Sequence, residues 1–241
     1  MNLDKIHKLQ QMGLGPVWVR RHGGPALGAI DTSVAPATLQ PSSDALDVAL
    51  GAMDWADLEN HIAECTRCGL CEGRKHTVPG VGDRHARWLF VGEGPGRQED
   101  LQGEPFVGPA GKLLDNMLRA LTLARGQDTY IANVVKCRPV GVDGRDRPPT
   151  NDEIAACMPY LRRQIALIRP QVIVALGKTA AVALLGVPTE TSLSSLRGAQ
   201  REFGGIPLVI TYHPAYLLRQ PADKAKAWRD LCLAKRIIDG N

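Results

Sequence analysis

Five of the six cysteines fall at spacings that suit a metal site. Three form a C-x-x-C-x-x-C run and two follow far along the chain: Cys65, Cys68, Cys71, Cys137 and Cys157. Two thiolates at C-x-x-C spacing can bind the same metal, and a distant second pair can complete a set of four ligands. Spacing alone does not separate a zinc ion from an iron–sulfur cluster. Cys232 lies in an apolar helical pattern and is expected to be an inert core thiol.

Three polar residues stand next to apolar runs that are typical of buried strands. Glu93 lies between two glycines in VGEGPG, Asn133 lies within YIANVV, and His213 follows LVITY. A carboxylate can stabilise developing positive charge, and an imidazole can donate a hydrogen bond to developing negative charge. Each residue also has a plain structural interpretation, such as a solvated loop carboxylate or a strand-end histidine. A catalytic interpretation therefore requires that the three residues meet at one site.

Short strands that alternate with helices are expected to position these residues. Four apolar, β-rich runs predict strands, at Trp88–Val91, Tyr130–Val135, Val172–Leu176 and Pro207–Thr211. A helix is expected from Trp55, and others at Gly111–Ala124, Asp152–Ile168 (with a capping-box pattern), Thr179–Leu185 and Lys224–Ile238. The alternation predicts an α/β fold with a parallel sheet covered on both faces. In such sheets, ligands bind beyond the carboxyl ends of the strands.

Two sequences that resemble phosphate-binding loops do not fit the required pattern. Gly111-Lys112 is followed by leucine, and Gly177-Lys178-Thr179 lacks the first glycine of G-x-x-x-x-G-K-[ST]. The GEGPG sequence has the wrong spacing for a dinucleotide fingerprint. We therefore expect neither an NTPase nor an NAD-dependent enzyme.

Composition and charge bound the class of protein. The chain has 241 residues, 44% hydrophobic and 22% charged, enough for one sizeable core plus an appendage. No apolar run approaches the roughly 18 residues of a membrane span, and the polar N-terminus has no signal-peptide pattern. Six cysteines without an export signal favour a reducing compartment, so we expect a cytoplasmic protein. The net charge of +4 suits a polyanionic partner without requiring one.

The N-terminal part of the chain differs in composition from the rest. Residues 23–45 are rich in Gly, Pro, Ala, Ser and Thr, which predicts a flexible linker. The linker belongs to an expected N-terminal appendage, residues 1–54, ahead of a catalytic domain at residues 55–241. The short helical stretch before the linker ends in MGLGPVWVRR and is a candidate either for docking a protein partner or for packing locally.

Several motifs, taken together and in order, resemble the family 4 uracil-DNA glycosylases, the iron–sulfur branch of that superfamily. They are C-x-x-C, VGEGPG followed by GEPFVGPAG, YIANVVKCRP, the helix with Cys157, VALG and TYHPAYLL, spanning Cys65 to Trp228. The resemblance implies a three-layer α/β/α fold with a central four-stranded parallel sheet. It also implies a DNA repair enzyme that flips uracil out of DNA and hydrolyses its N-glycosidic bond.

The resemblance further implies a structural 4Fe–4S cluster, held by Cys65, Cys68, Cys137 and Cys157. Cys71 is a departure, since the family pattern needs only the first two cysteines of the N-terminal run. A related crosslinking branch carries a basic, histidine-containing loop after the second strand. The segment VGVDGRDRPP at that place has no histidine, so ordinary hydrolytic turnover is expected.

A group of residues near the glycine loops is expected to recognise the flipped base. Phe106 offers an aromatic face for stacking, and the amide of Asn133 matches the O4 and N3–H edge of uracil but not the reversed pattern of cytosine. By resemblance, Glu99 fills the space that the methyl group of thymine would need. Gly92 and Gly94 would let backbone N–H groups approach the base and the phosphates.

Breaking the glycosidic bond leaves negative charge on the uracil and positive charge on the sugar. We expect His213, in its neutral form, to donate a hydrogen bond to O2 of uracil. We expect Glu93 to stabilise the oxocarbenium-like sugar and to orient the attacking water.

Contacts to DNA are expected from the segment after His213 and from basic residues. Leu217 or Leu218 would fill the space that the flipped base leaves. Arg197, Arg219 and the basic segment 136–147 would bind phosphates and make binding sensitive to salt. The expected partner is uracil-containing DNA, single- or double-stranded, bound by a monomer.

Three alternatives remain at this stage. One is a uracil-recognising relative with altered turnover, such as the crosslinking branch. The second is a zinc-bound nucleic-acid binding module without catalysis, and the third is a redox-sensing iron–sulfur protein. Broad visible absorbance would exclude the zinc module, and release of free uracil would exclude both the pure binder and the sensor.

Overall fold

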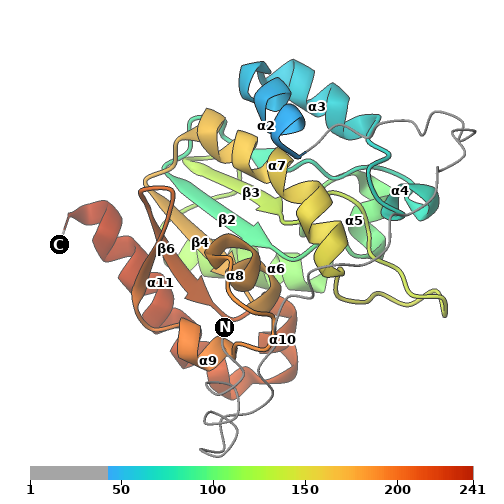
Figure 1. Ribbon diagram of the computed structural model, residues 1–241. Coiled ribbons are helices and arrows are strands. Elements are labelled where there is room, and N and C mark those ends of the chain that lie inside the picture. The colour runs from blue at the N-terminus through green and yellow to red at the C-terminus, as the bar shows by residue number, and fades with distance from the viewer. Residues whose placement is uncertain (1–42, 241) are drawn as a thin grey trace, which may run out of the picture. The chain divides into compact units, whose positions relative to one another are not determined.

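The computed structural model describes residues 43–240, and these belong to one compact unit (Figure 1). The strands are β1 (Val81–Gly82), β2 (Trp88–Gly92), β3 (Thr129–Asn133), β4 (Val172–Leu176), β5 (Gln200–Phe203) and β6 (Ile206–Thr211). The helices are α2 (Ser43–Ala52), α3 (Trp55–Ala63), α4 (Leu70–Gly73), α5 (Arg97–Gln102), α6 (Pro109–Ala120), α7 (Asn151–Ile168), α8 (Lys178–Leu185), α9 (Leu193–Leu196), α10 (Pro214–Arg219) and α11 (Lys224–Asp239). The expected N-terminal helical stretch, and residues 23–42 of the expected linker, lie outside the described residues.

A six-stranded sheet with the order β1-β3-β2-β4-β6-β5 forms the centre of the unit. The four inner strands are parallel to one another, which confirms the expected parallel sheet. Two antiparallel edge strands, β1 and β5, were not expected. Strand β1 has only two residues and β5 is mostly exposed, so neither carries the apolar run by which a buried strand is detected.

Helices cover both faces of this sheet and give the three layers (Figure 1). Every residue of β2, β3 and β4 is buried, because both faces are covered. Alternate residues of β2 face opposite sides: Leu89 and Val91 join a core with α2, α3, α7 and α8, whereas Trp88 and Phe90 join a core with α6 and α11. The predicted three-layer α/β/α architecture is therefore confirmed.

The helices on the first face include one that the sequence did not predict. Helix α2 begins at Ser43, within the expected linker, and packs against α7, with Leu50 fully buried. The capping box predicted for α7 is present, since Thr150 accepts a hydrogen bond from the Glu153 backbone while the Glu153 carboxylate accepts one from Thr150. Between residues 43 and 240, no helix is both long enough and apolar enough to cross a bilayer.

Candidate active site

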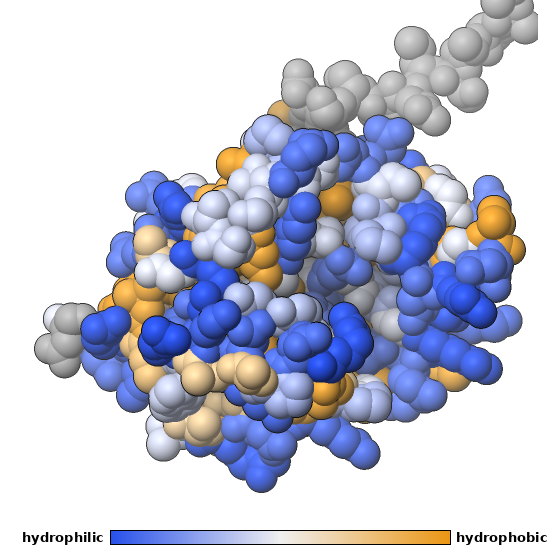
Figure 2. Space-filling view, turned by 90° about the horizontal axis from the view of Figure 1, so that it is seen from below, coloured by the Kyte–Doolittle hydropathy of each residue, from blue (hydrophilic) through white to orange (hydrophobic). Residues whose placement is uncertain are grey.

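The four parallel strands end at one edge of the sheet, and a pocket of about 380 Å³ opens there. Figure 2 views the molecule from below Figure 1 and shows a hollow among mostly hydrophilic side chains. Six of the residues predicted for catalysis and base recognition line the pocket: Glu93, Gly94, Glu99, Phe106, Asn133 and His213. They come from segments that are far apart in the sequence and are brought together by the strand order. Glu93, Asn133 and His213 therefore lie at one site, as the catalytic interpretation requires.

Glu93 follows directly after β2, and its carboxylate is held by a partner from another strand–helix junction. Its Oε2 accepts a hydrogen bond from the hydroxyl of Thr179, in the first turn of α8. This contact leaves the other carboxylate oxygen available to the pocket. From the sequence, Thr179 was considered as part of a failed phosphate loop and as the start of a predicted helix, but was given no role at the site. The sequence signal for its location was its position in the first turn of the helix after β4, at the sheet edge where β2 also ends.

His213 caps helix α10, and its surroundings fix both its charge and its tautomer. Its Nδ1 accepts a hydrogen bond from the backbone N–H of Ala215 at 3.1 Å, so the proton of the neutral ring lies on Nε2. Burial, and then the nearby positive charge of Arg219, lower the pKa of His213 from 6.5 to about 4. The ring is therefore neutral near pH 7 and has one N–H donor free of the cap.

Asn133 ends β3 and is buried, beside Gly92 of the neighbouring strand. Its Oδ1 has no hydrogen-bond partner among the described residues, and the side chain lines the pocket. A buried acceptor without a partner indicates a ligand that donates a hydrogen bond at that point. A Cβ at Gly92 would lie 2.4 Å from this oxygen and 2.6 Å from the Phe106 ring. Glycine at position 92 thus leaves room for both the Asn133 amide and the Phe106 ring.

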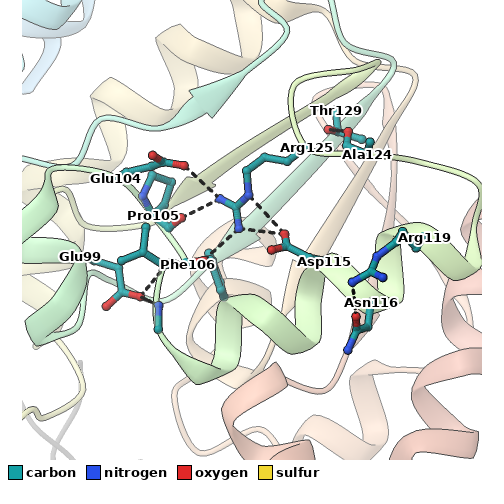
Figure 3. A network of polar contacts seen from close by, with 12 residues as sticks. Glu99, Glu104, Pro105, Phe106, Asp115, Asn116, Arg119, Ala124, Arg125 and Thr129 are labelled. Carbon is teal, nitrogen blue, oxygen red and sulfur yellow. Dashed lines mark hydrogen bonds and ion pairs between the residues drawn. The ribbon is translucent and has the colours of Figure 1, made fainter.

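The loop before α6 forms the remaining wall of the pocket. The Phe106 ring stacks on His213, with 5.5 Å between ring centroids and an interplanar angle of 29°. Glu99 lies on α5, and its Oε1 accepts hydrogen bonds from the backbone N–H groups of Val107 (3.0 Å) and Gly108 (3.1 Å), as Figure 3 shows. The Glu99 carboxylate therefore shapes the pocket wall in addition to lining it.

A second site lies on the α7 side of the sheet, where the cysteines converge. Five cysteines line one enclosed cavity without any carboxylate or histidine among its lining residues: Cys65, Cys68, Cys71, Cys137 and Cys157. Cys232 lies elsewhere, on α11. The four predicted ligands are thus brought together, and Cys71 lies with them.

Two polar groups beside the cysteine cavity contact sulfur atoms. Arg74 Nη1 lies 3.5 Å from Cys137 Sγ, and the backbone N–H of Lys136 lies 3.3 Å from Cys157 Sγ. Burial raises the pKa values of the Cys68 and Cys137 thiols and raises that of Cys157 to about 12. Within residues 43–240, no three Cys, His, Asp or Glu side chains are arranged to hold a single metal ion.

Comparison with known proteins places the chain in a family. The family model of the uracil DNA glycosylase superfamily matches residues 79–233. A protein of Pyrobaculum aerophilum named type-4 uracil-DNA glycosylase is 41% identical over 187 residues, covering 75% of this chain and 93% of that protein. The chain belongs to the type-4 uracil-DNA glycosylase family. The protein of the same name from Archaeoglobus fulgidus is 43% identical over 171 residues, covering 68% of this chain and 83% of the relative. A type-5 uracil-DNA glycosylase of P. aerophilum is more distant, 27% identical over 195 residues.

Two leucines on α10 of this type-4 family member, Leu217 and Leu218, were predicted as alternatives for filling the space that the flipped base leaves in the DNA. Leu217 has 1% of its surface exposed and belongs to the core, whereas Leu218 is 46% exposed. Only Leu218 is therefore available to a partner without unfolding α10. Arg219, the next residue, is also exposed.

The basic residues predicted to bind phosphate differ in their surroundings. The Arg197 guanidinium already binds groups of the protein itself. It donates to the Asp230 carboxylate at 2.6 Å and to the Lys226 carbonyl at 2.8 Å. Lys136 is buried, and its ammonium donates to the Asn133 carbonyl and to Gln164, both at 2.7 Å. Lys136 was expected to belong to a phosphate-binding surface, and this is wrong. A local count of basic residues does not reveal which of them the fold buries.

Proposed function

We propose that this protein excises uracil from DNA, hydrolysing the N-glycosidic bond to release free uracil and leave an abasic site. The observation that carries the proposal is the unpaired Asn133 Oδ1 in a pocket shared with Glu93 and a neutral His213. An amide, a carboxylate and a neutral donor at one sheet edge match the needs of base reading, sugar stabilisation and leaving-group stabilisation.

Base recognition begins with a uracil that has left the DNA stack. The N3–H of uracil donates to Asn133 Oδ1, which would otherwise stay unpaired, and the Asn133 amide donates to O4. Cytosine presents the reverse pattern and would leave buried groups unpaired. Phe106 supplies the stacking face, and Glu99, tied to the Val107 and Gly108 amides, limits the space at C5 and disfavours the thymine methyl group.

The chemical step breaks the bond between C1′ and N1, and both electrons go to the uracil. The Nε2–H of His213 donates a hydrogen bond to O2 and stabilises that negative charge, since the capped ring is neutral and fixed in this tautomer. Glu93, oriented by Thr179, stabilises the positive charge on the sugar and aligns a water. The water adds its hydroxyl to C1′, and its remaining proton neutralises the uracil anion.

DNA contacts follow from the exposed residues around the pocket. Leu218 enters the space that the flipped base leaves in the stack, and Arg219 binds a neighbouring phosphate. Gly92 and Gly94 allow the backbone after β2 to approach the base. The substrate is uracil-containing DNA, single- or double-stranded, bound by a cytoplasmic monomer. The appendage expected at residues 1–54 is proposed to include only the part of the chain before α2, because α2 packs against α7.

A 4Fe–4S cluster held by Cys65, Cys68, Cys137 and Cys157 fits the second site. Among Cys, His, Asp and Glu side chains, the cavity is lined by cysteines alone, and iron–sulfur clusters are held by cysteine thiolates. The Lys136 backbone N–H and Arg74 donate toward two of the sulfurs, as is usual around such clusters. When bound, the cluster has a structural role: it ties the segment after α3 to the β3–α7 connection. Cys71, which lines the same cavity, is the candidate substitute ligand.

The decisive experiment measures the release of free uracil from a uracil-containing oligonucleotide under single-turnover conditions. Two variants refine it. Glu93→Gln should lower the rate by about 10²- to 10³-fold with DNA binding nearly unchanged, since it removes one charge stabiliser. Asn133→Asp removes the donor to O4 and should lower uracil excision by at least about tenfold. A wild-type protein that binds uracil-containing DNA without releasing uracil would support the binding or crosslinking alternative instead.

A further inference from the structure

Phe106 stands in a backbone conformation that aromatic residues rarely adopt. Its φ is +56°, in the left-handed region where a Cβ makes the backbone strained. The residue is nevertheless buried, with its ring against His213 in the pocket. Such a conformation persists only where the surroundings determine it. The contacts that hold residues 105–108 therefore decide where the ring lies.

Arg125 binds this strained segment from outside the pocket, from the connection between α6 and β3 (Figure 3). Its Nη1 donates to the Pro105 carbonyl at 2.8 Å and its Nη2 donates to the Phe106 carbonyl at 2.9 Å. Its Nε and Nη2 also bind Asp115 Oδ1, at 3.2 and 3.0 Å. Its Nη1 also lies 3.6 Å from Glu104 Oε1, so two adjacent carbonyls and two carboxylates surround one planar guanidinium, an arrangement that a lysine cannot reproduce.

Glu99 and the first turn of α6 further restrict the loop at residues 105–108. Glu99 accepts the N–H groups of Val107 and Gly108, so the backbone groups on either side of the Phe106–Val107 peptide bond are bound by opposite charges. A Cβ at Gly111 would lie 1.6 Å from the Phe106 carbonyl oxygen, so the first turn of α6 packs directly on this residue. The loop has no room to relax toward α6.

We infer that Arg125 is a positioning residue for uracil excision: it holds Phe106 in the left-handed conformation and so presets the aromatic face on which the flipped base stacks. The inference rests on the proposed function of Phe106 and deepens it. Arg125 is not among the residues that line the pocket, so its proposed effect does not require contact with the base or the sugar. Its effect passes through the Pro105 and Phe106 carbonyls to the ring that stacks on His213.

The test compares the wild type with Arg125→Met, which keeps most of the aliphatic side chain but removes the guanidinium group. Maximal single-turnover excision of uracil should fall by at least about tenfold, while affinity for uracil-free DNA changes by less than about twofold. Arg125→Lys should not restore the wild-type rate, since the ammonium cannot bind both carbonyls and Asp115. The matched control is Arg119→Met, on α6 and bonded to Asn116, which should leave the rate unchanged.

A double-mutant cycle separates positioning from a merely structural role. Phe106→Gly removes the ring and relieves the backbone strain, so adding Arg125→Met to it should lower the rate by less than about twofold further. Full additivity of the two losses would overturn the inference, and so would an Arg125→Met protein with the wild-type rate. If Arg125→Met does not fold, Asp115→Asn, which loosens the guanidinium, provides the same cycle. A wild-type protein that releases no uracil would refute the proposed function itself.

Discussion

At the scale of single residues, the charge state of His213 decides what it can do for the leaving uracil. A neutral imidazole with its proton on Nε2 can only donate into the pocket, because Nδ1 is occupied by the Ala215 N–H. A protonated ring would have to give up this cap and place a second charge near Arg219. The cap, the burial and the arginine all favour the same neutral state. In the proposed mechanism, His213 therefore acts by hydrogen bonding and not as a general acid.

The pH dependence of excision tests this assignment. With a folded-state pKa of about 4, the maximal single-turnover rate should show no inflection near pH 6.5 that depends on His213. An inflection there that disappears in His213→Gln but persists in the exposed control His85→Gln would contradict it.

The stability of the fold should also depend on pH through His213. Between pH 6.5 and about 4, the unfolded chain binds a proton at His213 that the folded chain does not. The free energy of unfolding therefore loses this contribution as pH falls through that range, and keeps it in full above pH 6.5.

Sequence patterns could predict some site residues but not others, for a physical reason. Glu93 and His213 directly follow apolar strand runs and Asn133 lies within one, so a parallel sheet was expected to bring them to one edge. Thr179 and Arg125 act through contacts between segments 86 and about 20 residues apart, and no local pattern encodes such a pairing. The partner that orients a catalytic group is visible only once the strand order is known.

At the scale of elements, α10 presents the two predicted wedge residues in opposite ways. Its N-terminus is fixed by the His213 cap and Pro214, which sets the rotation of the whole short helix. Leu217 then faces the core and Leu218 is exposed. Sequence could place a leucine at this point but not its direction, because the helix has too few residues to show an amphipathic period.

We predict that Leu218→Ala slows excision from double-stranded DNA by about tenfold or more, and from single-stranded DNA much less. The wedge offsets the cost of unstacking and unpairing, a few kcal/mol, which is smallest for a single strand. Val48→Ala, exposed on α2, is the control and should change neither rate. Equal losses on both substrates would mean that Leu218 contacts the nucleotide itself. Leu217→Ala should instead destabilise the fold by about 2–5 kcal/mol.

At the scale of the whole molecule, the cysteine site joins parts of the chain that the sheet alone does not connect. Cys65 and Cys68 follow α3, Cys137 lies beyond β3, and Cys157 belongs to α7. The resemblance in sequence predicted this set. The structure adds that Lys136 lies between the two sites, with its backbone facing Cys157 and its ammonium on the Asn133 carbonyl. The proposed cluster site and the proposed base-reading residue, Asn133, therefore share one short segment.

Replacing one proposed ligand should expose this connection. Cys137→Ala should lose the broad visible absorbance of the purified protein. It should also lower Tm by at least about 10 °C, roughly 3 kcal/mol for a domain of this size. Cys232→Ala, on α11 away from the site, should retain both the colour and the Tm. Cys71→Ala is expected to behave like Cys232→Ala, and a colourless Cys71→Ala protein would show that the ligand set is wrong.

The last prediction concerns where the catalytic unit begins. Sequence composition placed the boundary at residue 55, because α2 starts inside a stretch that reads as linker. Yet α2 packs against α7 and buries Leu50, while the Met53 carbonyl accepts a hydrogen bond from Arg163 at 2.8 Å. Deleting residues 1–42 should therefore leave Tm and uracil excision on short oligonucleotides nearly unchanged.

Deleting residues 1–52 removes α2 but keeps the Met53 carbonyl for Arg163. Tm should then fall by about 5–15 °C, since the loss of one buried leucine alone costs about 2–5 kcal/mol. Leu50→Ala in the full chain removes the buried leucine side chain but keeps the remainder of α2. This substitution alone should give a large part of the decrease in Tm. The excision rate of folded protein should stay within about twofold of the wild type in every case, because α2 packs against α7 and contributes no residue to the pocket lining. An excision rate about tenfold lower after deletion of residues 1–42 alone would show instead that the N-terminal appendage completes the active site.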